Sequence, residues 1–231
     1  MVLKNFWTPQ IEAKLHAWHQ MQQVANIEKP APCFTIAREF GCQAYPLAEE
    51  LTRRLNARVA GDPWVIIGRQ ILDEVARLTG YTVEQIEKSQ DTPSALKAIF
   101  AMFLDPSTAE ETEVFTHMRT VIRGFARRGN CVLVGRGATC VTQDLPNCIH
   151  LRLVAPYQFR LEKIMRTHSL NETEARRFID LHQQQRDDFV RRFACDNIDD
   201  AMLYHLVINN SRISIEDMAA LAEFWMIRHT T

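Results

Sequence analysis

Short apolar runs alternate along the chain with longer stretches of helical periodicity. The clearest runs lie at residues 33–37, 131–134, 148–153 and 206–209. Runs of this kind are typical of strands buried on both faces of a parallel sheet, and the amphipathic stretches between them supply the crossover helices. The alternation therefore predicts an α/β fold, a three-layer sandwich in which a parallel sheet of about five strands is covered by helices on both faces.

A fifth strand and the helices follow from local signals. Residues 57–60 predict a short second strand, and the apolar positions from 64 to 78 recur at helical spacing. Pro46 suits the first position of a helix, whereas Asn171 and Ser214 are typical N-cap residues. We therefore expect helices at residues 9–27, 46–56, 64–78, 82–88, 93–104, 107–128, 156–168 and 171–193, and a last one after Ser214.

Charge and cysteine content narrow the class of protein. The 231 residues suit one large domain, and 27 Lys and Arg against 28 Asp and Glu give a formal net charge of −1. No global field attracts nucleic acid or an anionic membrane, so any anion-binding site must be local. The six cysteines form no C-x-x-C pair, and we expect reduced thiols. Because no signal peptide or long apolar span occurs, we expect a cytoplasmic protein that binds neither a membrane nor nucleic acid.

A candidate anion-binding loop follows the first apolar run. The run meets a turn at Gly41 and then a helical pattern. A strand, a tight turn and a helix N-terminus together point free backbone N–H groups at an anion. The phosphate-loop pattern G-x-x-x-x-G-K-[ST] also requires a second glycine, a lysine and a hydroxyl. All three are missing, since the residues from the glycine onward are Gly41, Cys42, Gln43, Ala44, Tyr45 and Pro46.

Two further groups of residues have alternative interpretations. Arg136 lies between two glycines directly after the run at 131–134, at the strand end where open α/β sheets bind ligands; the glycines could equally serve only the turn. The helix predicted at 171–193 carries several arginines beside carboxylates. They form either a solvated helix face with i,i+4 ion pairs or a lid that closes over phosphate groups. We expect His16 and His19 to be surface or packing residues, and we predict no metal site.

Four segments occur in a characteristic order along the chain: T-I-A-R-E-F-G at 35–41, V-L-V-G-R-G-A at 132–138, S-L-N-E-T-E-A-R at 169–176 and L-V-I-N-N-S-R at 206–212. Together they resemble the cytidylate kinase-like family of P-loop nucleoside monophosphate kinases, over about residues 33–225. The resemblance implies a P-loop NTPase-like domain at 33–231, preceded by an N-terminal helical extension and linker at 1–32. It also implies an inserted helical lobe for the nucleoside monophosphate at about 62–128 and a helical lid at about 157–195.

The family's reaction implies roles for particular residues. It transfers the γ-phosphoryl group of ATP to a nucleoside monophosphate, here expected to be CMP, while Mg²⁺ bridges the phosphates and no covalent intermediate forms. The resemblance implies that the ATP phosphates are held by Gly41, Cys42, Gln43, Ala44 and Tyr45. It implies catalytic roles for Arg136, Arg186 and Arg191. It implies acceptor binding by Arg69, Arg136, Asp187 and Asp188.

The loop departs from the family pattern at three positions. Tyr45 stands where the family commonly has an arginine, and Gln43 and Ala44 replace glycines. Residues with a Cβ adopt positive φ at a cost, and a missing charge-assisted contact is worth roughly 1.5–3 kcal/mol. Two functions therefore stay open: a nucleotide kinase, or a nucleotide-binding sensor or scaffold with a degenerate phosphate loop. A homodimer through the N-terminal helix also stays open.

Overall fold

The computed structural model describes residues 30–58, 61–68, 119, 122–135, 137–193 and 197–229. The strands are β1 (Cys33–Arg38), β2 (Val65–Ile67), β3 (Cys131–Val134), β4 (Cys148–Val154) and β5 (Leu206–Asn209). The helices are α2 (Ala44–Asn56), α7 (Ala138–Val141), α8 (Tyr157–His168), α9 (Glu172–Phe193) and α10 (Ile215–His229). Residues 122–128 are also helical, and a 3₁₀ turn at Ala201–Leu203 precedes β5.

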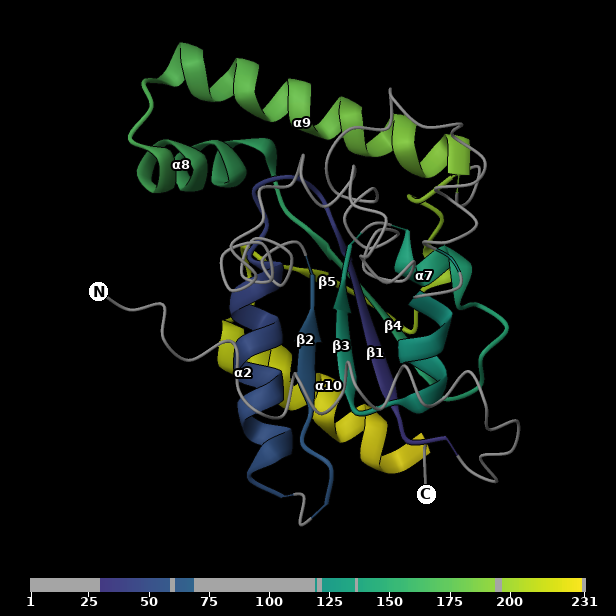
Figure 1. The fold of residues 1–231 in the computed structure, drawn as a ribbon. Coiled ribbons are helices and arrows are strands. Elements are labelled where there is room, and N and C mark those ends of the chain that lie inside the picture. Colours follow the sequence, from purple (N-terminus) through teal and green to yellow (C-terminus); the bar gives the residue numbers. More distant parts are fainter. Residues whose placement is uncertain are drawn as a thin grey trace, which may run out of the picture.

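The five strands form one parallel sheet in the order β2-β3-β1-β4-β5 (Figure 1). β1 is central and pairs with β3 on one side and β4 on the other, so Cys33 aligns with both Cys131 and Cys148. The chain adds β2 and β3 on one side of β1 before it adds β4 and β5 on the other. This reversal beside β1 is a topological switch point, where open α/β sheets bind ligands outside the carboxyl ends of the strands. The predicted α/β fold with a five-stranded parallel sheet is confirmed.

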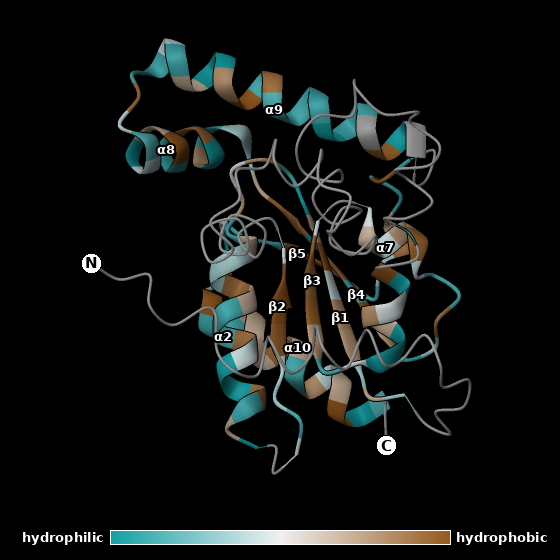
Figure 2. Cartoon of the chain, viewed as in Figure 1, coloured by the Kyte–Doolittle hydropathy of each residue, from teal (hydrophilic) through white to brown (hydrophobic). Residues whose placement is uncertain are grey.

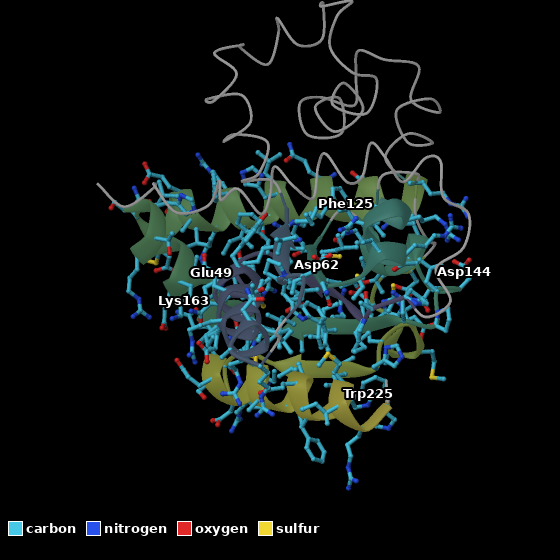
Figure 3. All side chains as sticks on the ribbon, turned by 60° about the horizontal axis from the view of Figure 1, so that its bottom comes forward. Glu49, Asp62, Phe125, Asp144, Lys163 and Trp225 are labelled. Atoms are coloured by element: carbon cyan, nitrogen blue, oxygen red, sulfur yellow. The ribbon has the colours of Figure 1, made fainter. Side chains whose placement is uncertain are left out.

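Helices cover both faces of the sheet. On one face α2 packs against α10 and the strands, and Leu47, Leu51 and Leu55 are buried along one side of α2. Burial of a leucine side chain contributes about 1.5–3 kcal/mol. On the other face lie α7 and the helix at 122–128, and Figure 3 shows Phe125 of that helix and Trp225 of α10 on opposite sides of the strands. The strands between these layers are strongly apolar (Figure 2).

Helices α8 and α9 form a hairpin beyond the carboxyl ends of the strands, where α9 lies across the end of the sheet (Figure 1). The Oδ1 of Asn171 accepts the Glu174 N–H at 3.0 Å, and the Glu174 carboxylate accepts the Asn171 N–H at 2.9 Å. This capping box explains why α9 begins there. The two helices enclose a small apolar core of their own, made by Leu161, Ile164, Ala175 and Ile179.

The second strand lies later in the chain than predicted. α2 ends at Asn56 with Ala57 as its C-cap, and the strand is Val65–Ile67, which pairs with β3. The strand predicted at 57–60 is therefore wrong, and so is the start of the helix predicted at 64–78. Val65–Ile67 consists of three consecutive β-branched residues, which favour an extended backbone beside a neighbouring strand.

The other predicted helices are confirmed where the structure describes them. α2 begins at Ala44 after Gln43 as N-cap, so Pro46 occupies the third helical position and not the first. Its missing N–H is still one that has no partner inside the helix. At the start of α10 the Ser214 hydroxyl accepts the Asp217 N–H at 3.1 Å, which confirms the predicted cap.

Some predictions fall outside the described residues. These are the N-terminal helix at 9–27, through which a homodimer was one option, and the helices predicted between residues 69 and 118. The expectation of six reduced thiols is wrong at Cys140, which is disulfide-bonded, whereas Cys33, Cys42, Cys131 and Cys148 are free. In the described part of the chain, no helix combines the length and apolar character needed to span a membrane.

Candidate functional site

A cavity of about 830 Å³ opens beside β1 at the carboxyl end of the sheet. The segments that follow β1 and β3 form one part of its wall, and α8 and α9 form another. It therefore lies at the topological switch point, and its volume is within the range typical of small-molecule sites.

The loop at residues 39–43 is supported from behind by Arg160 of α8. Gly41 has a φ of +94°, and a Cβ at this position would lie 2.8 Å from the Cβ of Arg160, so only glycine fits. The Arg160 Nη1 donates to the Phe40 carbonyl oxygen at 3.2 Å, and its Nε lies 3.4 Å from the Glu39 carboxylate. The charge of Arg160 is thus balanced inside the protein, and this arginine holds the loop without lining the cavity.

Most backbone N–H groups of the loop donate hydrogen bonds inside the protein. Cys42 donates to the Glu39 carbonyl oxygen at 3.2 Å, and Gln43 donates to the Oδ1 of Asn210, just after β5, at 2.7 Å. Ala44 donates to the Cys42 carbonyl oxygen at 3.1 Å across Gln43, whose φ of −88° and ψ of 54° are close to an inverse γ-turn. The loop therefore keeps few N–H groups for a phosphate, and side chains must supply most of the attraction.

Phe40 couples this loop to α9. Its ring centroid lies 5.6 Å from that of Phe178 and 5.0 Å from that of His182, and the guanidinium carbon of Arg186 is 4.8 Å from it. The Phe40 N–H donates to the Oε1 of Gln183 at 2.7 Å. One loop residue thus contacts about two turns of α9, and this contact places Arg186 over the loop.

Positive side chains dominate the described lining of the cavity. One carboxylate, Asp187, faces five cationic side chains: Arg38, Arg152, Lys163, Arg166 and Arg186. The formal net charge of the whole chain is −1, so this is a local concentration of charge. Partly desolvated walls strengthen the attraction between such a cluster and a multiply charged anion.

The protein holds these cations in different ways. Arg152 is 4% exposed, forms an ion pair with Asp199 and donates from Nη1 to the Tyr204 hydroxyl at 3.5 Å. Arg38, at the end of β1, has its guanidinium carbon 5.9 Å from the ring centroid of Tyr45. The first charge has a carboxylate partner, whereas the second is placed against an aromatic face.

Two groups beside the cavity are held uncharged. Burial raises the pKa of the Cys42 thiol to about 12, so at neutral pH it is protonated and cannot act as a nucleophile. Burial, helped by the charge of His205, lowers the pKa of His150 to about 4. The His150 Nδ1 lies 2.8 Å from the Thr35 Oγ1, which lies 2.8 Å from the Oγ1 of Thr139 on the cavity wall. His150 and Thr35 therefore form an uncharged hydrogen-bonded group behind Thr139 of the cavity wall.

The structure brings some of the predicted site residues together and separates others. Those that line the cavity are Gly41, Cys42, Gln43, Ala44, Tyr45, Arg186 and Asp187. Arg191 is exposed, does not line the cavity, and lies 3.5 Å from the exposed carboxylate of Asp188. Arg69 and Arg136 lie outside the described residues.

Among the five cations of the cavity, the family resemblance implies Arg186 and, as a weaker candidate on the helix before it, Arg166. It does not imply Arg38, Arg152 or Lys163. Arg38 and Arg152 belong to strands that are mostly apolar. A charge in a buried strand requires a partner or a ligand, and a strand end in an open α/β sheet is where ligands bind. The sequence shows such a charge for Arg38, which stands at the end of an apolar run. Nothing in the sequence distinguishes Lys163 from other lysines on helices.

The described residues do not fit a protein-held Mg²⁺ ion. Mg²⁺ prefers oxygen ligands, and phosphate-loop enzymes offer it a hydroxyl from the loop and a carboxylate. Pro46 occupies the hydroxyl position, and Asp187 is the one carboxylate among the described lining residues. Within the described ranges no group of three or more His, Cys, Asp or Glu side chains could hold a metal ion. No catalytic step is assigned here to a metal bound by the protein.

Known proteins resemble this chain in sequence pattern and in fold. The model of the cytidylate kinase-like family matches residues 33–212. An uncharacterized protein from Eubacterium ventriosum has a TM-score of 0.56 at 18% identity, covering 85% of this chain and 97% of that one, and shares the fold. Shikimate kinase from Bacteroides thetaiotaomicron has a TM-score of 0.45 at 15% identity, covering 85% and 98% of the two chains. No curated protein matches the chain.

Proposed function

Because the chain belongs to the cytidylate kinase-like family, we propose that it transfers the γ-phosphoryl group of ATP to a nucleoside monophosphate, with CMP as the acceptor. The observation that carries this proposal is the convergence of five cationic side chains on one cavity in a chain whose net charge is −1. Phosphate groups are the small polyanions that such a cavity suits. ATP and nucleoside monophosphates are cytoplasmic solutes, and we place the reaction in the cytoplasm.

The lining residues receive roles in this proposal. Residues 41–45 flank the ATP phosphates, and Arg186 approaches the transferring group from α9. The contact between Arg186 and Phe40 supports this role, because it orients the guanidinium group before a ligand arrives. Arg69 and Arg136 bind the acceptor phosphate.

The remaining lid residues complete the assignment. Asp187 lines the cavity and accepts a hydrogen bond from the Nε2 of Gln183 at 2.8 Å, so its carboxylate is oriented toward the acceptor side in our proposal. Arg191 serves as a second phosphate clamp, and Asp188 holds it through their ion pair.

The chemistry requires positioning and neutralisation of charge. In phosphoryl transfer the attacking and leaving oxygens are roughly in line. In the transition state, negative charge spreads over the equatorial oxygens of the transferred phosphoryl group. Guanidinium groups neutralise this charge, and no protein nucleophile is needed. Mg²⁺ enters as part of the Mg·ATP substrate, with phosphate oxygens and water as its ligands.

A second function is favoured by the hydrogen bonds of the loop. Because Cys42, Gln43 and Ala44 donate their N–H groups inside the protein, the loop supplies little of the amide contact that stabilises a transferring phosphate. The alternative is a nucleotide-binding sensor or scaffold that binds ATP without turnover.

Calorimetry and a turnover assay separate the two functions. The protein is titrated with Mg·ATP and with CMP, and ADP release is then followed over a panel of nucleoside monophosphates. The kinase proposal expects ADP release that depends on the acceptor and falls at least tenfold in Arg186→Ala, since loss of a charge-assisted contact is worth roughly 1.5–3 kcal/mol. Arg176→Ala is the matched control, because Arg176 lies on the same helix, exposed and paired with Glu172. ATP binding without acceptor-dependent ADP release would identify the sensor, and absence of both would contradict the proposal.

A further inference from the structure

The loop lacks its cation at position 45. The family commonly has an arginine there, at the start of the helix, and phosphate loops use a basic residue beside the loop to contact the outer phosphates. This chain has Tyr45, whose hydroxyl lies so close to Gly68 that a Cβ at that glycine would overlap it. The tyrosine side chain thus extends from α2 toward the end of β2 and occupies the side of the cavity where a basic residue would otherwise lie.

Arg38 fills the neighbouring space from the end of β1. Its guanidinium carbon is 5.9 Å from the Tyr45 ring centroid. On the β3 side, a Cβ at Gly135 would overlap the Arg38 Nη1, and Gly135 has a φ of +83° that favours glycine. The guanidinium group is therefore fixed between an aromatic ring and a bare α-carbon, and both flanking residues line the same cavity as Arg38.

The charge of Arg38 has no carboxylate partner among the described residues. Arg152 pairs with Asp199 and Arg160 lies beside Glu39, whereas the groups that act electrostatically on Arg38 are Tyr45 and Cys42. The Cys42 thiol is uncharged at neutral pH, because burial raises its pKa to about 12. Burial also lowers the pKa of the Arg38 guanidinium. A desolvated cation without a counter-charge is costly, and such an arrangement is typical of sites that bind an anion.

We propose that Arg38 replaces the missing basic residue at position 45 and binds the terminal phosphate oxygens of the nucleoside triphosphate from the end of the central strand. Arg38 lies on the central strand, seven positions before Tyr45 in the sequence. A planar guanidinium group also offers two parallel donors to one phosphate, which a lysine cannot. This proposal rests on the proposed function, because it requires that the cavity binds a polyphosphate.

The first test measures polyphosphate affinity directly. Wild type, Arg38→Gln and the control Arg53→Ala are titrated by calorimetry with sodium tripolyphosphate and with adenosine. Arg53 is an exposed arginine of α2 that pairs with Glu50 and does not line the cavity. We expect Arg38→Gln to lose ten- to hundredfold in tripolyphosphate affinity, Arg53→Ala to match wild type, and adenosine binding to be equal in all three proteins.

The second test asks whether the two positions are equivalent. The double variant Arg38→Gln/Tyr45→Lys returns a cation to the usual position, and we expect it to recover at least tenfold in tripolyphosphate affinity over Arg38→Gln. A purely structural role for Arg38 would not be rescued by a charge on a different element. Failure of the rescue, or Arg38→Gln binding as tightly as wild type, overturns the proposal for Arg38 and leaves the proposed function intact.

A third measurement uses the wild-type protein, so its result does not depend on whether a variant folds. Phenylglyoxal modifies accessible arginines, and peptide mapping by mass spectrometry follows its reaction at Arg38 and Arg53. We expect saturating tripolyphosphate to slow the reaction at Arg38 at least fivefold and to leave Arg53 unchanged. Equal rates at Arg38 with and without tripolyphosphate contradict the proposal. Wild type that binds neither tripolyphosphate nor ATP contradicts the proposed function itself.

Discussion

Single side chains around the cavity differ in whether the protein balances their charge. Arg160 lies beside Glu39 and Arg152 pairs with Asp199, so each has a carboxylate that holds it in place without a ligand. Arg38 lies against the ring of Tyr45 instead, with no carboxylate among the described residues. Arg160 and Arg152 are therefore held in place without a ligand, and Arg38 is the one of the three whose environment improves most when an anion binds.

Gly41→Ala is expected to destabilise the protein. The residue has a φ of +94° and its α-carbon packs against Arg160, so alanine adds about 1–2 kcal/mol for the left-handed backbone and a clash besides. Urea unfolding at neutral pH measures the loss in the free energy of unfolding. Cys42→Ala is the matched control in the same loop, with a negative φ and a free thiol, and we expect a smaller effect there. Equal stability of Gly41→Ala and wild type would contradict the role of this glycine.

Cys42 is expected to resist alkylation. Its thiol has a pKa raised to about 12 by burial, so at pH 8 only about one molecule in ten thousand carries the reactive thiolate. Iodoacetamide treatment followed by mass spectrometry measures the rate, with glutathione in the same tube as a reference thiol. We expect Cys42 to react at least a hundredfold more slowly than glutathione. A rate equal to that of glutathione would show that the loop is open.

At the level of whole elements, the contact between Phe40 and α9 couples this helix to the loop. Phe178, His182 and Arg186 recur at intervals of four residues, so they share one face of the helix, and all three pack on the ring of Phe40. Gln183 adds a hydrogen bond to the Phe40 N–H. A displacement of α9 would therefore break contacts that hold the backbone of the loop.

Phe40→Ala is expected to loosen α9 more than the core. The substitution removes the ring that three lid residues contact, whereas the sheet retains its own packing. Hydrogen exchange measured by mass spectrometry should rise in peptides covering Glu172–Phe193 and stay constant in peptides covering β1 and β4. Phe224→Ala is the control, because this phenylalanine is 60% exposed on α10. Unchanged exchange in α9 would show that other contacts hold the lid.

The elements that the sequence predicts best are those with a strong local signal. β1, β3, β4 and β5 coincide with mostly apolar runs, and α9 and α10 begin at capping residues with their hydrogen bonds in place. β2 is missed because it has three residues, and its β-branched sequence adjoins positions with helical spacing. What decides its conformation is pairing with β3, a contact between segments more than sixty residues apart.

For the whole molecule, stability is expected to depend on pH through His150. Its pKa is lowered to about 4 by burial and by His205, against about 6.5 in an unfolded chain. Between about pH 6.5 and pH 4 this histidine is protonated in the unfolded chain but stays neutral in the folded protein. Protonation therefore stabilises the unfolded chain, and the free energy of unfolding decreases as pH falls from about 6.5 to 4. The pKa of His205 is also lowered, which acts in the same direction.

Urea unfolding at pH 7.0, 5.5 and 4.5 tests this dependence. We expect the contribution of His150 to be about 2 kcal/mol over that range. The slope should be smaller in His150→Gln, which keeps a polar side chain beside Thr35, and unchanged in His168→Gln, whose side chain is exposed. A slope that is the same in wild type and His150→Gln would contradict the assignment.

The candidate site is only partly predictable from sequence. Family resemblance identifies the loop at 41–45 and the lid residues Arg186 and Asp187, which the fold brings to one cavity. Resemblance alone places Arg191 there as well, but its side chain is exposed, because the direction of a residue on a charged helix depends on how the helix is docked. The pairing of Arg38 with Tyr45 depends on the angle between a strand and a helix, which no local pattern encodes.

The hydrogen bond from the Gln43 N–H to Asn210 has a consequence for how the protein is made. The two residues are 167 positions apart, so a ribosome synthesising about 5–20 residues per second needs roughly 8–33 seconds to deliver the acceptor after the loop has emerged. During that interval the nascent chain contains β1, the turn and α2 but not Asn210, whose side chain holds the turn. The turn therefore gains this hydrogen bond only after the last strand, β5, has been synthesised and has joined the sheet.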